Sequence, residues 1–520
     1  MADVVIIGAG HNGLVAAILL ARAGLAVEVL ERYTIVGGAC RTETPFARAP
    51  ELRASTGAYL LGPMQPELLA LLDIELPLVR RDPHYFMPTL NGRHLLLGAD
   101  DERNEAQFSE FFTAQDWRAQ QALSAELSAL ASDLAPAWLQ PPASAEETAE
   151  RHIRPSLQEH FLSLVRGSAL DYLTRFGFAS ELLLAMYAIT DGMPGLSGSP
   201  WSPGSGHNLL VHNMCRLPGA DGTWMVVRGG MGTVTQTLAA AAAKAGAVIR
   251  TGVSATAITV RDGAAAGVVT ADGGSLPARA VLAATDPYRL PGLLGGACPA
   301  ALTERVDRYA AGSAGQTMKV NLALSELPRF AALPEPVGQH TTTVHLMPPP
   351  AADGSVLTAI RDAFDAAAAG RLDPLPPVEW YLHSTLDPSL RDAEGRHSSA
   401  LFVQGVPHQP AGSTWDAERA GYADRLLHLV DRYAPGIAAL VDDLEVLAPP
   451  DIEARFGITG GNIMHVDNAF SFTERMPYRV GVDGVYAGAA GCFPAGSVIG
   501  SAGHNAARTI LTDLGAPGGW

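Results

Sequence analysis

The first 41 residues constrain the fold of this chain more than any other part of the sequence. An apolar run over residues 4–7 leads into Gly8-Ala9-Gly10-His11-Asn12-Gly13, and an alanine- and leucine-rich segment continues to Gly24. A second run of mainly apolar residues, 26–31, ends at Glu31. This order predicts a strand, a glycine turn, a helix and a second, parallel strand.

Each part of this segment suits a bound dinucleotide. Gly8 permits the tight turn out of the strand, Gly10 lets a pyrophosphate approach the backbone, and Gly13 lets the helix pack against the sheet. The helix N-terminus offers N–H groups to phosphates, and the carboxylate of Glu31 can accept hydrogen bonds from ribose hydroxyls. The alternative is an ordinary buried β-α-β unit without a ligand. The motif alone leaves NAD and FAD open.

The length and charge of the chain limit its class. A chain of 520 residues exceeds the size of one core, so we expect two joined domains. The net charge of −17 argues against a nucleic-acid partner, because phosphates demand a basic surface. No apolar run of eighteen residues lies outside the N-terminal unit, and no secretory n-region is present, so we expect a cytoplasmic protein without an integral membrane segment. The four cysteines are scattered, and we expect no metal site.

Later segments predict a second sheet, a helical region and another glycine-rich turn. Leucine and phenylalanine recur at helix spacing from about residue 102 to 190, and a glycine- and proline-rich stretch over 191–212 predicts a long loop. Residues 80–98, 318–324, 380–383 and 401–406 predict strands. Near the C-terminus, an apolar strand meets a glycine-rich turn, and a helix is expected to begin near Val498.

The chain resembles a known group of flavoproteins. The run Val36-Gly37-Gly38-Ala39-Cys40-Arg41 resembles the second FAD motif of glutathione-reductase-like flavoproteins, although relatives often carry arginine where Ala39 stands. With Gly229-Gly230-Met231-Gly232, the strand at 318–324, Gly460-Gly461-Asn462-Ile463 and His504-Asn505-Ala506-Ala507, it resembles phytoene-desaturase-related FAD oxidoreductases over nearly its whole length. Within them it is most similar to the pyridine nucleotide-disulfide oxidoreductase domain proteins.

The resemblance implies an α/β fold with an amine-oxidase-like topology. A discontinuous, glutathione-reductase-like Rossmann FAD-binding domain would be built from residues 1–80, 220–290 and 455–520. An α+β substrate domain with a mixed sheet would be built from residues 81–219 and 291–454, with its helical cap at about 102–190.

The resemblance also assigns contacts to FAD. Those to the adenosine and pyrophosphate fall on Gly8, Gly10, Gly13, Glu31, Arg32, Gly37, Gly38 and Arg41. The backbone of Ala255 would meet the adenine, and Gly488, Ser497, Val498 and Ile499 would contact phosphate and flavin. For Arg41 the alternative is an ordinary surface arginine.

Three residues are candidate catalytic groups. In the amine-oxidase branch a strand lysine at the place of Lys319 holds a water near flavin N5, and a buried lysine shifts its pKa toward neutrality; the alternative is an inert lysine in an ion pair. Glu474 stands with Arg475 where the family chain approaches the flavin, and both could instead be pocket or ion-pair residues. His207, at the end of the predicted loop, could serve as acid or base, or be structural.

These expectations lead to an FAD-dependent oxidoreductase of desaturase or oxidase type. It would remove a hydride from a largely apolar small-molecule or carrier-bound substrate, and oxygen or a quinone would reoxidise the flavin. One alternative is a flavin-dependent cis-trans isomerase or saturase of a polyene. Another is a non-catalytic flavin-fold binding protein. The sequence also leaves open whether the protein forms a homodimer.

Overall fold

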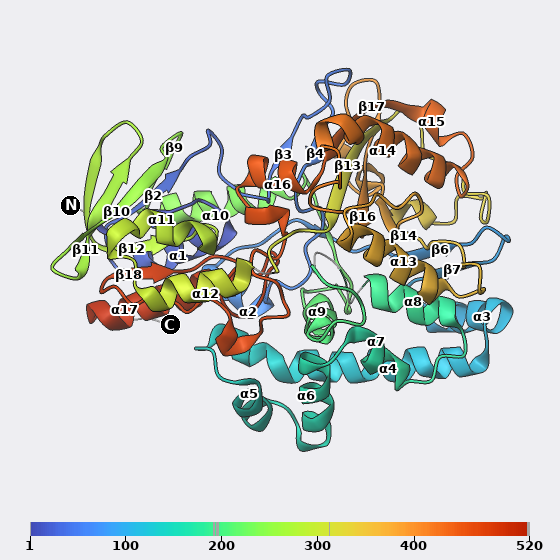
Figure 1. Ribbon diagram of the computed structural model, residues 1–520, viewed down its shortest axis with the longest axis horizontal. Coiled ribbons are helices and arrows are strands. Elements are labelled where there is room, and N and C mark those ends of the chain that lie inside the picture. Colours follow the sequence, from blue (N-terminus) through green and yellow to red (C-terminus); the bar gives the residue numbers. More distant parts are fainter. Residues whose placement is uncertain (1, 191–192, 194–196, 311, 517–520) are drawn as a thin grey trace.

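The computed structural model describes residues 2–190, 193, 197–310 and 312–516. Two large sheets organise it (Figure 1). The predicted loop at 191–212 lies partly outside the described residues, and its last part is helical, because α9 covers Ser205–His212. The sequence also placed the last helix too early, since α17 begins at Ser501 after a left-handed Gly500.

The first sheet carries the glycine motif. Its order is β10-β11-β12-β1-β2-β9, with β18 beside β12. The neighbours β12, β1, β2, β9 and β18 pair in parallel, and β10-β11-β12 form an antiparallel meander. The strands are β1 (Ala2–Ile7), β2 (Val27–Glu31), β9 (Val248–Thr251), β10 (Ala255–Arg261), β11 (Ala264–Thr270), β12 (Ser275–Ala283) and β18 (Val485–Ala487).

The first sheet is covered by helices that come from both ends and from the middle of the chain. Helix α1 (His11–Arg22) packs against α10 (Gly232–Lys244) and α17 (Ser501–Leu514). Nearly every residue of α1 is buried, as expected for a helix that is apolar on most of its surface. The backbone N–H of Gly503 donates to the Asn12 side chain at 3.2 Å, which fixes α17 against α1.

The second sheet is mostly antiparallel, and its order is β17-β13-β16-β15-β14-β6-β7. Strand β14 pairs in parallel with β6, which precedes it by more than two hundred residues. The strands are β6 (Tyr85–Pro88), β7 (His94–Leu97), β13 (Thr317–Leu324), β14 (Thr343–Leu346), β15 (Val378–Tyr381), β16 (His397–Gln404) and β17 (Val441–Leu447). Helix α14 (Trp415–Asp431) supplies Leu426 and Val430 to the core on this sheet.

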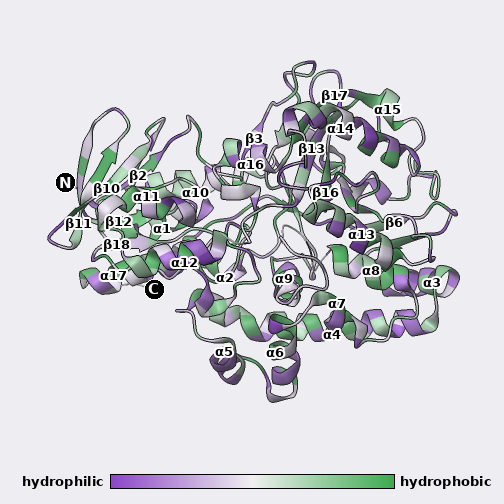
Figure 2. Cartoon of the chain, in the orientation of Figure 1, coloured by the Kyte–Doolittle hydropathy of each residue, from purple (hydrophilic) through white to green (hydrophobic). Residues whose placement is uncertain are grey.

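A layer of helices, α3 to α7, crosses the lower part of Figure 1, with α3 and α4 below the second sheet and α5 and α6 lowest in the view. These are α3 (Asp101–Phe111), α4 (Ala114–Leu134), α5 (Ala145–His152), α6 (Gln158–Arg166), α7 (Ala169–Thr174) and α8 (Glu181–Thr190). Hydrophobic and hydrophilic bands alternate along α4 in Figure 2, and its leucines at 123, 127, 130 and 134 are buried. Among the described residues, no helix is both long and apolar enough to cross a membrane.

Shorter elements connect these layers. Between them lie α2 (Pro66–Leu72), α11 (Leu290–Leu294), α12 (Ala300–Ala310), α13 (Val356–Ala368), α15 (Ile437–Leu440), α16 (Pro449–Phe456), the pair β3 (Thr42–Glu43) and β4 (Ala54–Ser55), and the pair β5 (Leu78–Val79) and β8 (Val226–Val227). Helix α13, which lies between two proline-rich segments, was not predicted from the sequence. Each large sheet draws its strands from segments predicted for one domain, while the bounds of the two domains stay a prediction.

Candidate functional site: a dinucleotide cradle and a polar wall

A cavity of about 1430 Å³ is lined by residues of both sheets. The β1–α1 turn, the end of β2 and the segment after β9 line one part, and strands β13 to β16 line another. Pockets for a single small ligand measure about 300–1,000 Å³. The cavity therefore has room for a dinucleotide together with a second molecule.

The glycines of the β1–α1 turn are of two kinds: at some a side chain would clash with the backbone, and at one there is open space. A Cβ on Gly13 would lie 2.2 Å from the backbone oxygen of Gly8, so only glycine lets α1 approach the strand. Gly8 has a φ of +107°, and a Cβ there would lie 2.7 Å from the backbone oxygen of Ala284. Gly10, the N-cap of α1, lines the cavity, and a Cβ there would meet no atom of the described residues within 4 Å. This open position before the α1 N-terminus suits a pyrophosphate.

The acid predicted to bind ribose is buried at the end of β2 and lines the cavity. Glu31 accepts hydrogen bonds from the backbone N–H groups of Ala9 at 2.9 Å and Tyr33 at 3.0 Å. These two bonds fix its carboxylate beside the glycine turn. Arg32 also lines the cavity, and its guanidinium donates to the Tyr33 hydroxyl at 2.8 Å.

The second glycine pair lies directly against the first turn. The backbone N–H of Gly37 donates to Ala9 at 2.9 Å, and both Gly37 and Gly38 have positive φ angles and line the cavity. A Cβ on Gly37 would lie 2.5 Å from the backbone oxygen of Cys40. The two glycine motifs therefore form one continuous wall.

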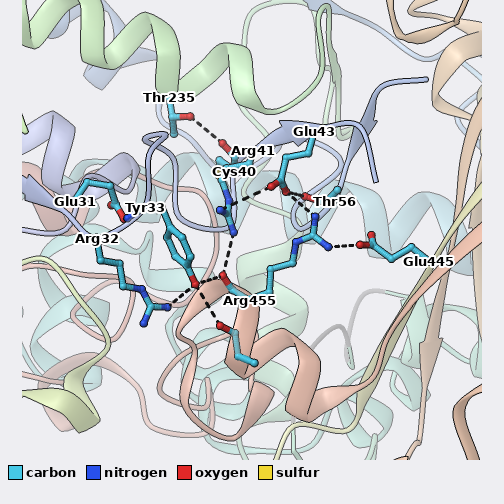
Figure 3. A network of polar contacts seen from close by, with 11 residues as sticks. Glu31, Arg32, Tyr33, Cys40, Arg41, Glu43, Thr56, Thr235, Glu445 and Arg455 are labelled. Atoms are coloured by element: carbon cyan, nitrogen blue, oxygen red, sulfur yellow. Dashed lines mark hydrogen bonds and ion pairs between the residues drawn. The ribbon is translucent and has the colours of Figure 1, made fainter. Parts of the chain in front are cut away.

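Arg41, which the sequence predicted to contact a phosphate, lies outside the cavity lining. It is buried. In the network of Figure 3 it donates to the backbone oxygen of Arg455 at 3.1 Å and stacks over Tyr33, with its guanidinium 4.7 Å from the ring centre. Arg455 in turn donates to Glu43 at 3.1 Å. Arg41 thus joins the second glycine loop to α16, and its contact to a phosphate stays a prediction.

The FAD contacts predicted for the later part of the chain fall into two groups, those that line the cavity and those that do not. Ala255, Ser497 and Val498 line the cavity, whereas Gly488 and Ile499 do not. A Cβ on Gly488 would lie 2.7 Å from the Ala506 side chain, so this glycine lets β18 pack against α17. Ile499 belongs to the core of the helical layer. Ala489 and Ala490, which the sequence analysis did not single out, complete this wall.

Lys319 of β13 is buried and lines the cavity. Its Nζ donates to the backbone oxygens of Ser55 and Gly57, the latter at 2.7 Å, and lies 5.0 Å from the centre of the Tyr59 ring. Burial lowers the pKa of Lys319 to about 7, against the attraction of Glu445, and the charge of Arg455 lowers it further. An amine with this pKa exchanges a proton readily at neutral pH.

The other two candidate catalytic residues lie away from Lys319. His207 is buried and does not line the cavity; its Nδ1 is 2.9 Å from the backbone oxygen of Asn468, and burial lowers its pKa to about 4. Glu474 is exposed and does not line the cavity either. The structure does not bring them together with Lys319, so their positions give the predicted roles no support.

Arg475, the neighbour of Glu474, is fully buried rather than part of a pocket. Its guanidinium donates to five backbone oxygens and to the side chain of Asn468.

A polar wall on the second sheet was not predicted from the sequence. Arg81, His345, Glu379, Tyr381 and Phe402 line the cavity from β14 to β16 and from the segment before β6. Arg81, His345 and Glu379 are each buried, although they carry ionisable groups. A signal was present, because Glu379 and His345 interrupt apolar strands, but strand order was needed to bring them together.

Three related proteins cover nearly the whole chain. Pyridine nucleotide-disulfide oxidoreductase domain-containing protein 2 of Mus musculus is 34% identical, over 98% of this chain and 94% of its own. One subunit of the limonene dehydrogenase of Castellaniella defragrans is 25% identical, over 99% of this chain and 95% of its own. Hydroxyneurosporene desaturase of Cereibacter sphaeroides is 26% identical, over 98% of both.

The model of the family described as flavin containing amine oxidoreductase matches residues 13–347. The chain belongs to this family. A putrescine oxidase triple mutant shares its fold with a TM-score of 0.61 at 18% identity, over 99% of both chains. The predicted resemblance, the mixed α/β fold with a Rossmann-like FAD-binding region, and the assignment as an FAD-dependent oxidoreductase are confirmed.

The glycine turns and the acid that line one part of the cavity form a cradle, made of Gly8, Gly10, Glu31, Gly37 and Gly38. The residues of this cradle fit FAD, the cofactor of this flavoprotein family. Gly10 leaves open space before the α1 N-terminus, Glu31 is held in the cavity wall, and the volume exceeds that of a single small ligand. All four cysteines are free. In the part of the chain that the structure describes, no cluster of His, Cys, Asp and Glu could hold a metal ion.

Proposed function

We propose that this flavoenzyme removes a hydride from a C–H bond of a largely apolar small molecule and forms a C=C or C=N bond. FAD supplies the hydride acceptor when it is bound. Oxygen or a quinone-type compound then takes up the two electrons. The observation that carries the proposal is the buried Lys319 in the cavity wall, beside the Ser55–Gly57 backbone.

In the proposed reaction, Lys319 handles the proton that leaves with the hydride. The donor carbon loses a hydride, which carries two electrons and one proton. The neutral amine at Nζ accepts a second proton from the neighbouring atom, either directly or through one water molecule. The backbone oxygens of Ser55 and Gly57 orient the amine, because both accept hydrogen bonds from it. Tyr59 and Phe402 cover this part of the cavity with aromatic surface, which excludes water from the reacting bond.

Two relatives support an apolar substrate. The dehydrogenase and the desaturase are named for limonene and hydroxyneurosporene, respectively. Neither name fixes the substrate of this chain. We propose a small substrate, or one presented by a carrier, because FAD would fill much of a cavity of about 1430 Å³ and leave limited room beside it.

Anaerobic mixing of the oxidised holoenzyme with limonene, hydroxyneurosporene and putrescine tests the proposal. We expect an apolar probe to bleach the flavin absorbance near its visible maximum and to yield a product two hydrogen atoms poorer. Product formation without bleaching would instead indicate isomerisation. Bleaching by putrescine alone would indicate an amine oxidase, and a purified protein that takes up no FAD would contradict catalysis altogether.

A further inference from the structure

A row of side chains crosses the second sheet along the cavity. Lys319 of β13 pairs with Phe402 of β16, Phe402 with Glu379 of β15, and Glu379 with His345 of β14. All four line the cavity. Since neighbouring strands lie about 4.8 Å apart, the row extends about 14 Å from Lys319 to His345. Lys319, the proposed proton acceptor, stands at one end of the row. His345 stands at the other end, which we call the polar end.

Arg81 stands at the polar end, and it is buried in the cavity wall. Its Nε donates to the backbone oxygen of Trp224 at 2.8 Å, and its Nη1 donates to the Thr343 hydroxyl on β14 at 2.5 Å. In the described part of the chain, no carboxylate lies within 4.0 Å of its guanidinium. Burial lowers the pKa of Arg81, and the charges around it, which include Glu379, oppose this shift without cancelling it. A buried guanidinium whose charge is incompletely balanced is costly, so its place in a cavity wall favours a ligand that supplies further negative charge.

His345 is the second polar group at this end. Only 2% of its surface is exposed, it stacks on Tyr85 with ring centres 4.1 Å apart, and neither ring nitrogen has a hydrogen-bond partner among the described residues. Burial and the charge of Arg81 lower its pKa well below 6.5, so the ring is neutral. A neutral imidazole has one N–H to donate. A buried side chain that lacks partners and lines a cavity has its hydrogen bond available for a bound molecule.

Glu379 lies in the same row and could instead suggest a cationic ligand. Its carboxylate, however, already accepts hydrogen bonds from the Tyr381 hydroxyl and from Gln404 Nε2, the latter at 3.2 Å. The same carboxylate favours the charged form of Arg81, so its charge already has partners within the protein. Arg81 and His345 contribute donors, so the group they suit is an acceptor with negative charge.

We propose that the substrate carries a carboxylate that binds to Arg81 and His345, about 10–14 Å from the reacting bond at Lys319. The inference rests on the proposed hydride transfer and names its substrate class: an apolar chain that ends in a carboxylate. Arg81 fixes the charged end, while Phe402 and Tyr59 cover the apolar part. The oxidation then occurs at a carbon remote from the carboxylate.

Calorimetric titration of the holoenzyme with decanoate, decanol and decylamine tests this site without turnover. We expect decanoate to bind about ten- to hundredfold more tightly than decanol, as charged hydrogen bonds provide. Arg81→Gln should remove this preference and leave the affinity for decanol unchanged. His345→Phe should lower the preference severalfold. Arg93→Gln, which changes an exposed arginine outside the cavity wall, is the matched control and should change nothing.

The outcomes separate this inference from the proposed reaction. Equal affinities for decanoate and decanol in the unaltered holoenzyme would overturn the carboxylate site, whatever the variants do, and so would a preference for decylamine. A preference that survives Arg81→Gln in a folded, FAD-containing variant would also overturn it. Decanoate binding with no flavin reduction by any apolar probe would instead contradict the proposed reaction and leave the site in place.

Discussion

The Nζ of Lys319 donates a hydrogen bond to the backbone oxygen of Gly57 at 2.7 Å, although the two residues are 262 positions apart. The next residue, Ala58, donates its N–H to the backbone oxygen of Ala39 at 2.9 Å, directly after the second glycine pair. Strand β13 of the second sheet and the second glycine pair are therefore joined through one short loop.

The rate of anaerobic flavin reduction should rise with pH through about 7. The pKa of Lys319 is lowered to about 7, so the neutral amine is scarce below that pH and dominant above it. If the neutral amine accepts the proton, the rate increases about tenfold per pH unit below pH 7 and becomes constant above it. Stopped-flow absorbance between pH 5.5 and 9 measures this profile. Lys319→Met should lose the inflection and react about 10²–10⁴-fold more slowly, and an inflection that persists in this variant would assign it to another group.

Alanine at two neighbouring glycines should have opposite effects. In Gly13→Ala the new Cβ would lie 2.2 Å from the backbone oxygen of Gly8, so we expect a loss of about 1–3 kcal/mol in the free energy of unfolding. In Gly10→Ala the Cβ meets no described atom within 4 Å, and φ is −73°, which alanine adopts freely. That variant should unfold like the parent yet bind FAD more weakly. Denaturant unfolding and equilibrium FAD titration check both, and unaltered FAD affinity in Gly10→Ala would place the pyrophosphate elsewhere.

The sequence predictions were accurate where the interacting residues lie close together along the chain, and they failed where these residues are far apart in sequence. The cradle was predictable because Gly8, Gly13 and Glu31 lie within one β-α-β unit, where backbone rules fix their arrangement. The polar wall was not, because Arg81 meets Thr343 only after β14 pairs with β6. Motif spacing also could not show that Arg41 points to α16, since that direction depends on Arg455, which lies 414 residues away.

Glu31→Gln should weaken FAD binding with little effect on the fold. The carboxylate holds the backbone N–H groups of Ala9 and Tyr33, and glutamine can keep only one of these acceptors while losing the charge that suits ribose hydroxyls. We expect the dissociation constant for FAD to rise about ten- to hundredfold. Glu28→Gln on the same strand is the control, because Glu28 pairs with Arg250 at 2.9 Å and does not line the cavity. Equal effects of the two changes would show that charge on β2, and not contact with FAD, matters.

Arg475→Leu should be among the most destabilising single changes in this chain. The guanidinium donates to Ala490 at 2.8 Å, to Cys492 at 3.0 Å and to Val466 at 3.1 Å, and so ties two chain segments together. Its removal leaves buried carbonyl oxygens without donors, and we expect a loss of about 3–5 kcal/mol in the free energy of unfolding.

The matched control for this change is Arg479→Leu. Arg479 is exposed and pairs with Asp513 at 2.7 Å, so its loss should cost at most about 1 kcal/mol. Urea unfolding of both variants measures the difference. Since Ala490 lines the cavity, Arg475→Leu should also release FAD more readily, whereas Arg479→Leu should not. Equal stabilities of the two variants would mean that the carbonyl oxygens around Arg475 find other donors, and that the wall of the cradle does not depend on this arginine.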